Sequence, residues 1–249
     1  VQIPPDVVET IAGNKWNGRE IMAFLLQKRG DQVRITPDVV KAAAGNKGNG
    51  KELMALLLEK RGNEVQITPD VVKAAAWNEG NGKELMALLL EKRGDEVQIT
   101  PDVVKAAAEN KGNGKELIAL LLEKRGDEVQ ITPDVVKAAA GNEWNGKELM
   151  ALLLEKRGDE VPITPDVVKA VAGNTWHGKE LLELLLEKRG DEVPITPDVV
   201  KAVAGNEWNG KELMELLLEK RGDQVPITLD VVKAAAWNGR KGKEVMALI

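Results

Sequence analysis

The sequence predicts an all-α protein, an open α-solenoid of helix–loop–helix repeats. Three observations predict it: a 32-residue period, a helix-start signal at the same place in each copy, and a wide apolar face on the second predicted helix. A fixed period in this range is typical of solenoids, in which each unit buries its apolar face only against its neighbours. Ile99–Gln130 is a representative copy and reads ITPDVVKAAAENKGNGKELIALLLEKRGDEVQ.

The period divides residues 1–249 into a single predicted solenoid domain with seven full copies and a truncated eighth. Terminal copies must turn to water a face that internal copies bury, so their sequences are expected to deviate. Phe24 in the first copy and Leu229 in the last are two such deviations. The predicted copies are 3–34, 35–66, 67–98, 99–130, 131–162, 163–194, 195–226 and 227–249.

The first helix of a copy is predicted to begin at a Thr-Pro-Asp signal such as Thr36 to Asp38. Thr suits the N-cap, Pro the first helical position, and Asp the positive end of the helix dipole. The helix then runs to about Ala44, where an asparagine follows in every copy. Because Asn tolerates positive φ better than most residues, we expect it to end the helix in the left-handed conformation. These asparagines are Asn14, Asn46, Asn78, Asn110, Asn142, Asn174, Asn206 and Asn238.

The second helix is predicted to begin with the capping box that Asn49 and Glu52 would form. Its leucines and methionine spread over roughly 200° of the helical wheel, so we expect it to be sandwiched between neighbours, with only a narrow line left for solvent. Gly62 is expected to supply the turn at its end. The link Val65–Ile67 is expected to be an extended connector, because Pro162, Pro194 and Pro226 occupy its middle position in later copies.

The repeat unit resembles ankyrin repeats. The segments TPDVVKAAA and NGKELMALLLEKRGDEV look like the ankyrin patterns TPLHLAA and NGHLEVVKLLLEAGADV, and the resemblance covers the whole chain. The loop between the helices is longer here, the ankyrin β-hairpin is reduced to a Val-x-Ile link, and the His of TPLH is absent. More closely, the unit is similar to an ankyrin-like repeat of fungal proteins that occurs near NACHT-type nucleotide-binding modules. That resemblance implies a sensor or scaffold segment. The near-identity of the copies would equally suit a designed consensus array.

The residue inventory argues against an enzyme. The chain has one histidine, His177, and no cysteine or tyrosine, so nucleophilic triads and thiolate or imidazole metal sites lack their residues. We therefore expect no catalytic residue, cofactor or metal. A net charge of −5 with interleaved signs argues against nucleic-acid and membrane binding. No run of apolar residues is long enough for a membrane span, and a cytoplasmic location is expected.

The copies differ mainly around the repeated asparagine, and all six tryptophans lie there. Exposed Trp is enriched in binding hot spots, and three lysines follow three residues after the tryptophans of consecutive copies, which predicts an aromatic ridge with positive charge. Glycine takes the main tryptophan position in three copies with no other apparent change. The predicted partner-binding residues are Trp16, Trp77, Trp144, Trp176, Trp208, Trp237, Lys147, Lys179 and Lys211.

The sequence favours a non-enzymatic scaffold that binds a protein or peptide through these tryptophan-bearing loops. Two alternatives stay open at this stage. Each indole could instead lie flat over its own or the next loop as a lid, and the array could be a structural spacer or a designed array without a ligand. The sequence indicates neither the partner nor the oligomeric state.

Overall fold

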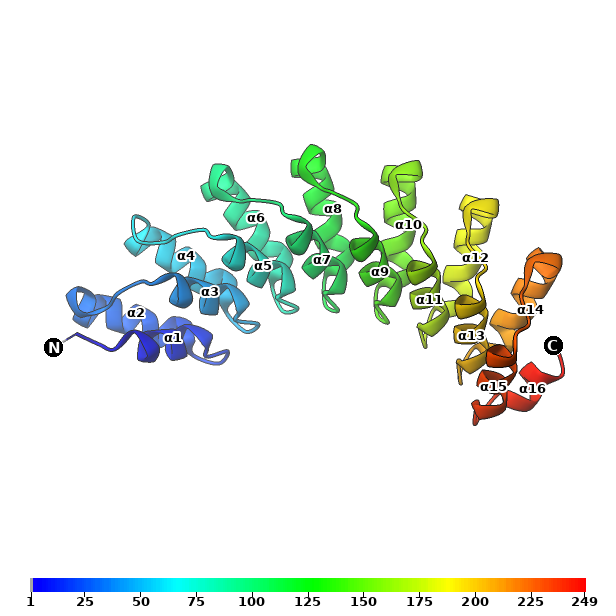
Figure 1. Cartoon of the computed structure of the whole chain (residues 1–249). Coiled ribbons are helices and arrows are strands. Elements are labelled where there is room, and N and C mark those ends of the chain that lie inside the picture. Colours follow the sequence, from blue (N-terminus) through cyan, green and yellow to red (C-terminus); the bar gives the residue numbers. More distant parts are fainter. Residues whose placement is uncertain (1) are drawn as a thin grey trace. The chain divides into compact units, whose positions relative to one another are not determined.

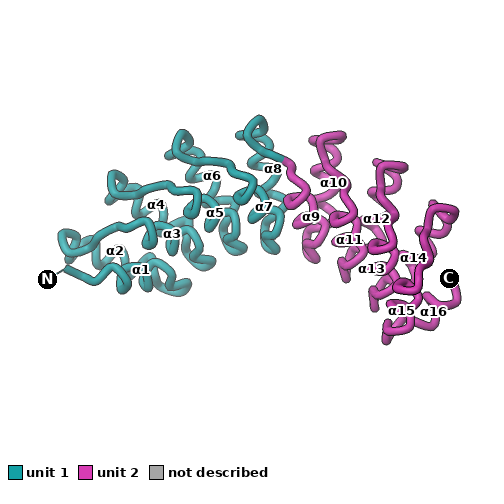
Figure 2. Tube along the Cα trace, in the orientation of Figure 1, with its two compact units in different colours: residues 1–130 teal, residues 131–249 magenta. Residues whose placement is uncertain are grey.

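The computed structural model describes residues 2–249. Those residues form sixteen α-helices and no β-strand, so the all-α prediction is confirmed (Figure 1). The chain divides into two compact units, unit 1 (Val1–Gln130) and unit 2 (Ile131–Ile249) (Figure 2). Within each unit, a first helix packs against the next first helix and against its own second helix, and successive second helices pack against each other. This repeated packing is that of an α-solenoid.

Unit 1 contains four helix pairs. Its first helices are α1 (Pro5–Gly13), α3 (Pro37–Gly45), α5 (Pro69–Trp77) and α7 (Pro101–Glu109). Its second helices are α2 (Gly18–Arg29), α4 (Gly50–Arg61), α6 (Gly82–Arg93) and α8 (Gly114–Arg125). Single turns of 3₁₀ helix follow three of them, namely η1 (Gly30–Gln32), η2 (Gly94–Glu96) and η3 (Gly126–Glu128).

Unit 2 repeats this arrangement. Its first helices are α9 (Pro133–Gly141), α11 (Pro165–Gly173), α13 (Pro197–Gly205) and α15 (Leu229–Trp237). Its second helices are α10 (Gly146–Arg157), α12 (Gly178–Arg189), α14 (Gly210–Arg221) and the short α16 (Gly242–Met246). The 3₁₀ turns are η4 (Gly158–Glu160), η5 (Gly190–Glu192) and η6 (Gly222–Gln224).

The predicted start of the first helices is confirmed. In α3 the Oγ1 of Thr36 accepts a hydrogen bond from the backbone N–H of Val39 at 3.4 Å, and Pro37 occupies the first helical position. The same cap recurs in every copy from the second to the eighth. The first copy has Pro4 in place of Thr, and α1 begins without a side-chain cap.

The core consists of valines and alanines of the first helices and of apolar residues of the second helices, at least three in each second helix from α4 to α14 but one each in α2 and α16. In α5 and α6, for example, Val71, Ala75, Leu85 and Leu89 have no exposed surface. The leucines at two other positions of each second helix, such as Leu58, are only partly buried. The prediction that the second helices are sandwiched with one narrow solvent line is therefore too strong, and grooves lie between them.

The turn after each second helix differs from the prediction in unit 1. Gly62 has φ −50° and ψ −36°, so the chain continues with a right-handed turn and needs no positive φ there. Within residues 2–249, positive φ occurs only at Gly158 and Gly190 of unit 2, at 43° and 38°. The connector that follows is extended and belongs to no β-strand in residues 2–249, as predicted. Its first valine, such as Val65, is buried.

Candidate protein interface

The asparagine after each first helix is not a left-handed cap. Asn110 has φ −66° and ψ 117°, which is extended backbone, and every residue with positive φ in the described part of the chain is glycine. The side chain explains the repetition instead. Its Nδ2 donates to the carbonyl oxygens of Ala76 and Asn78 in the preceding copy at 2.8 and 3.1 Å. Its Oδ1 accepts from the backbone N–H groups of Gly112 and Asn113 at 2.9 Å.

This side chain is buried and fully used, since an amide offers two donors and one oxygen with two lone pairs. Asn110 is 1% exposed. Equivalent bonds to an alanine carbonyl 34 residues earlier are made within unit 1 by Asn46 and Asn78 and within unit 2 by Asn174, Asn206 and Asn238. In each unit these residues form an asparagine ladder, which fixes the loop of one copy to the preceding copy.

The second asparagine of the loop also acts between copies. The predicted capping box is wrong, because the side chain of Asn49 makes no cap bond to its own helix. Its Oδ1 accepts from the backbone N–H of Arg19, in the first turn of the preceding second helix, at 3.2 Å, and its Nδ2 donates to the Lys15 carbonyl at 3.0 Å. Asn81 repeats both contacts on the copy before it. The starts of α2, α4 and α6 are therefore each capped by the next copy.

The ladder also fixes the backbone of the main tryptophan position, two residues later. The N–H groups of Trp144, Trp176 and Trp208 donate to the ladder oxygen at 3.0, 3.1 and 2.9 Å. The side chains project into solvent, with 70%, 71% and 53% of their surface exposed. At the other position Trp77 is 48% exposed and Trp237 is 85% exposed, so the lid alternative does not describe these indoles. Trp16, in the first copy, is exposed as well.

Glycine at the main tryptophan position has a steric reason that the sequence did not reveal. A Cβ built on Gly48 would lie 1.9 Å from the carbonyl oxygen of Lys15, and one on Gly80 would lie 1.9 Å from that of Lys47. The next residue has φ of −145° in Asn49 of unit 1 and −125° in His177 of unit 2. The glycine loops are thus packed against the preceding loop, and the expectation that Gly and Trp interchange without other change is wrong.

The lysines expected to make the tryptophan ridge positive are mostly neutralised. Lys179 lies 3.6 Å from Glu183, and Lys211 lies 3.4 Å from Glu215. Lys147 has Ala151 at the equivalent position, so it lacks this partner. Arg240 adds a cation at the end of the row, with its guanidinium 3.8 Å from the ring centre of Trp208. The surface around the tryptophans is therefore more aromatic than cationic.

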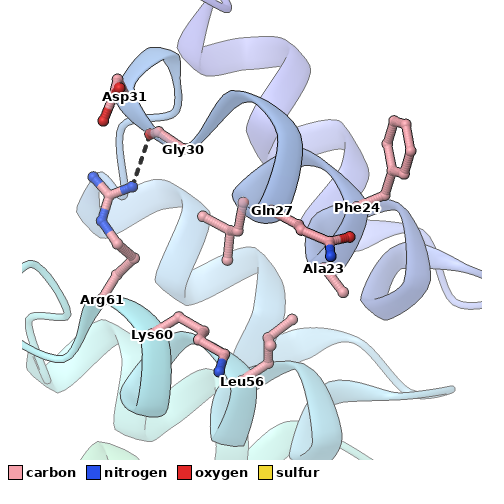
Figure 3. Close-up of a pocket in the computed structure, with 9 residues that line it drawn as sticks. Ala23, Phe24, Gln27, Gly30, Asp31, Leu56, Lys60 and Arg61 are labelled. Atoms are coloured by element: carbon pink, nitrogen blue, oxygen red, sulfur yellow. Dashed lines mark hydrogen bonds between the residues drawn. The ribbon is translucent and has the colours of Figure 1, made fainter.

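A second surface lies between successive second helices. In unit 1, α2 and α4 enclose a groove of about 850 Å³ whose walls include Gln27, Leu56 and Lys60. Figure 3 shows Gln27 and Leu56 on the two facing helices, and Phe24 at the rim with its ring directed away from Leu56. The same groove recurs between α4 and α6 with about 470 Å³ and between α6 and α8 with about 450 Å³.

The arginine at the end of each groove links its own copy to the preceding one, a role that the sequence analysis did not predict. Arg61 donates to the carbonyl oxygen of Gly30 in the turn of the preceding copy at 2.9 Å (Figure 3), and to that of Val33, just after this turn, at 3.2 Å. It also pairs with Glu64 of its own copy. The sequence contains a signal for a structural role of this arginine, because the triplet Lys-Arg-Gly recurs at the end of the second helix in all seven full copies.

The neighbouring lysines of the grooves pair with the glutamate just before them. Lys60 donates to Glu59 at 2.6 Å, and this hydrogen bond holds the pKa of the Glu59 carboxyl below its ordinary value. The same contact lowers the pKa of Glu91 and Glu123. Both partners are more than half exposed, so these ion pairs are open to exchange with other charged groups.

Comparison with known protein families identifies the family of the repeat. A family model described as a domain of unknown function, DUF7104, matches eight times, over residues 1–22, 24–54, 56–86, 88–117, 120–150, 152–181, 184–214 and 216–246. The chain belongs to the DUF7104 family. No curated protein and no solved structure matches the chain. The resemblance to ankyrin repeats and to NACHT-associated arrays stays a prediction.

Each internal DUF7104 match begins inside one second helix and ends inside the next. The match over 56–86 therefore contains a whole connector, a first helix and a tryptophan-position loop, between two half helices. The described residues of the array hold no group of three or more carboxylate, imidazole or thiolate side chains that could bind a metal ion. Nor do they include a helix that could cross a bilayer, and the longest have 12 residues.

Proposed function

We propose that this DUF7104 array is a non-enzymatic scaffold that binds another protein through the tryptophan loops of unit 2. The observation that carries the proposal is the exposure of Trp144, Trp176 and Trp208 on a fixed backbone. An indole that stays in water gains nothing for folding, and Trp is the residue type most enriched among residues that dominate binding energy. The proposal agrees with the scaffold role that the ankyrin-like resemblance implies.

Preorganisation supports the same proposal. The backbone N–H of each of these residues is bonded to the asparagine ladder, and the ladder side chains are buried. A partner that contacts the indoles therefore does not have to order the loop, which removes one of the costs of association. Because Lys179 and Lys211 each have a glutamate nearby, their positive charge is balanced locally, and we expect apolar contacts to contribute more than attraction of an acidic partner.

The test compares the full chain with a variant in which Trp144, Trp176 and Trp208 are changed to Gly. Both proteins capture prey under the same conditions, and prey that depends on the indoles is then purified and titrated directly. Trp176→Gly alone is expected to weaken binding by about 2 kcal/mol or more, with the unfolding curve unchanged. Trp16→Gly, outside unit 2, is the matched control and should leave binding unchanged.

The alternative function is a structural spacer without a ligand. The close similarity of the copies is what favours it. If the full chain and the triple variant capture the same proteins in the same amounts, the indoles contribute nothing to recognition. If the full chain captures no specific protein at all, the spacer function replaces the scaffold.

A further inference from the structure

The three grooves of unit 1 form a second surface that uses none of the tryptophans. Each has an apolar floor and one basic wall, built from equivalent residues of successive second helices. Between α4 and α6 the floor is Ala55, Leu58 and Leu88, and Lys92 stands on the wall. Leu58 and Leu88 are only partly buried, so apolar surface is accessible in the groove between α4 and α6. The packing of the solenoid does not explain why this surface is exposed.

The charge of these grooves distinguishes unit 1 from unit 2. The groove between α4 and α6 is lined by two basic side chains and one acidic one, Glu59. The groove between α12 and α14 is lined by two basic and three acidic side chains, and Glu183 there takes the place of Ala55. The first groove carries Gln27 in place of the helix glutamate. Among the side chains that line them, each groove of unit 1 therefore has one more basic than acidic residue, whereas the groove of unit 2 has one more acidic than basic residue.

The basic wall can accept an external carboxylate. The lysine of each groove, such as Lys60, is 55% exposed in its side chain and its pair with Glu59 is exposed as well. Exposed ion pairs contribute no more than about 1 kcal/mol, so a carboxylate held by a second contact can replace Glu59 at little cost. The neighbouring Arg61 is already bonded to the carbonyl oxygens of the preceding turn and fixes the wall in place.

We propose that the grooves of unit 1 bind an acidic segment of another protein in extended conformation, with one apolar side chain in each groove and Asp or Glu between them. Packed helices lie about 8–10 Å apart. A chain in the polyproline II conformation advances about 3.1 Å per residue with three residues per turn, so three residues span one repeat and bring the next side chain back to the same face. The separate cavities then require an apolar residue at every third position of the partner, with carboxylates facing Lys60, Lys92 and Lys124.

The experiment pans a displayed library of random 12-residue peptides over the full chain and measures the Kd of the enriched peptides. The matched variant changes Ala23, Ala55 and Ala87 to Glu. Each new glutamate has a basic residue four positions earlier, namely Arg19, Lys51 and Lys83, which reproduces the native arrangement of Lys179 and Glu183 in unit 2. The variant is therefore expected to fold, and circular dichroism checks it.

Enriched peptides are expected to carry apolar residues three apart with acidic residues between them, and to lose at least tenfold in affinity for the glutamate variant. They should bind the Trp144, Trp176 and Trp208 to Gly variant unchanged, which separates this proposal from the function proposed for unit 2. Failure to enrich any peptide, a consensus without acidic residues or with apolar residues seven apart, or equal affinity for the glutamate variant would each overturn it.

Discussion

The loops of unit 1 and unit 2 share one hydrogen-bond framework, and most loops of unit 1 have Gly where most loops of unit 2 have Trp. Both are fixed by buried ladder asparagines, such as Asn78 and Asn206, whose Nδ2 reaches back to the preceding copy. Two residues later unit 1 has Gly80, with the preceding carbonyl where a Cβ would be, whereas unit 2 has an exposed Trp208. The same backbone contact, from the N–H of this residue to the ladder oxygen, is kept in both.

The difference shows that the residue two positions after the ladder asparagine determines which of two kinds of loop forms, a closely packed glycine loop or a loop that exposes a tryptophan. Glycine permits close packing of consecutive loops, and the residue after it then has φ near −145°. In unit 2, a side chain at this position goes with φ of −125° to −114° in the next residue, whether the side chain is that of Trp176, Trp208 or Arg240. Loop packing and aromatic display are thus alternatives, and the ladder is the part that both need.

The largest expected effect falls on the shared framework. Asn78→Gly and Asn206→Gly should each destabilise the array by about 3–5 kcal/mol, because buried donors and acceptors lose their partners and each unsatisfied group costs about 1–3 kcal/mol. Urea unfolding followed by circular dichroism measures the loss, and hydrogen exchange locates it in the mutated loop. A left-handed cap would make Asn→Gly nearly neutral, so a small effect in both units would contradict the ladder.

These asparagines also show how far the sequence could be read. The 32-residue period, the Thr-Pro caps and the apolar faces act within one copy, and they predicted the all-α fold correctly. The role of Asn110 depends on carbonyls in the copy before it, at 34 and 32 residues' distance. The sequence pattern shows only that Asn recurs in every copy. A left-handed backbone turn and a side chain that bonds to the preceding copy would both explain that recurrence.

The candidate site, like the fold, could be predicted where the pattern acts within one copy, and not where it depends on contacts between copies. The tryptophans were singled out from their variability, and the structure finds them exposed. The neutralisation of Lys179 and Lys211 was open to prediction, because Glu183 and Glu215 follow them by four residues on a helix. The steric need for Gly80 was not, because the clashing atom belongs to the loop of another copy. The grooves of unit 1 depend in the same way on how neighbouring helices meet.

The second prediction exchanges the two kinds of loop. Gly80→Trp should destabilise unit 1 by about 2–3 kcal/mol, because the new Cβ requires the loop of Lys47 to move away. The reverse change, Trp176→Gly, should alter the free energy of unfolding by less than about 0.5 kcal/mol, since an exposed side chain is removed. Urea midpoints of the two variants give the comparison. Equal effects would mean that the two loop types do not differ in packing.

A smaller effect is expected where unit 2 combines an aromatic with a cation. Arg240→Ala removes the guanidinium from the face of Trp208 and should cost about 0.5–1 kcal/mol, the usual range for an exposed cation–π pair. A double-mutant cycle with Trp208→Gly isolates the pair, since each single change abolishes the contact. The Trp208 indole should also become more accessible to a fluorescence quencher. A coupling energy of zero would show that the stacking does not stabilise the loop.

The smallest expected effect concerns pH and the turn of unit 2. Hydrogen bonding from the Arg189 guanidinium holds the pKa of the Glu192 carboxyl below its ordinary value near 4.5. A carboxyl whose pKa is lower in the folded state than in the unfolded chain stabilises the fold above the unfolded pKa, and this contribution is lost as the pH falls through the folded pKa. Glu192→Gln should therefore lower the urea midpoint slightly at pH 7, and the difference from the wild type should shrink as the pH falls below 4.5. Gln is native at this position in the copies of Gln32 and Gln224, so the fold tolerates it, and the bonds from Arg189 to the Gly158 and Val161 carbonyls remain. A difference between the two proteins that is as large at pH 3 as at pH 7 would assign the effect to packing and not to the charge of Glu192.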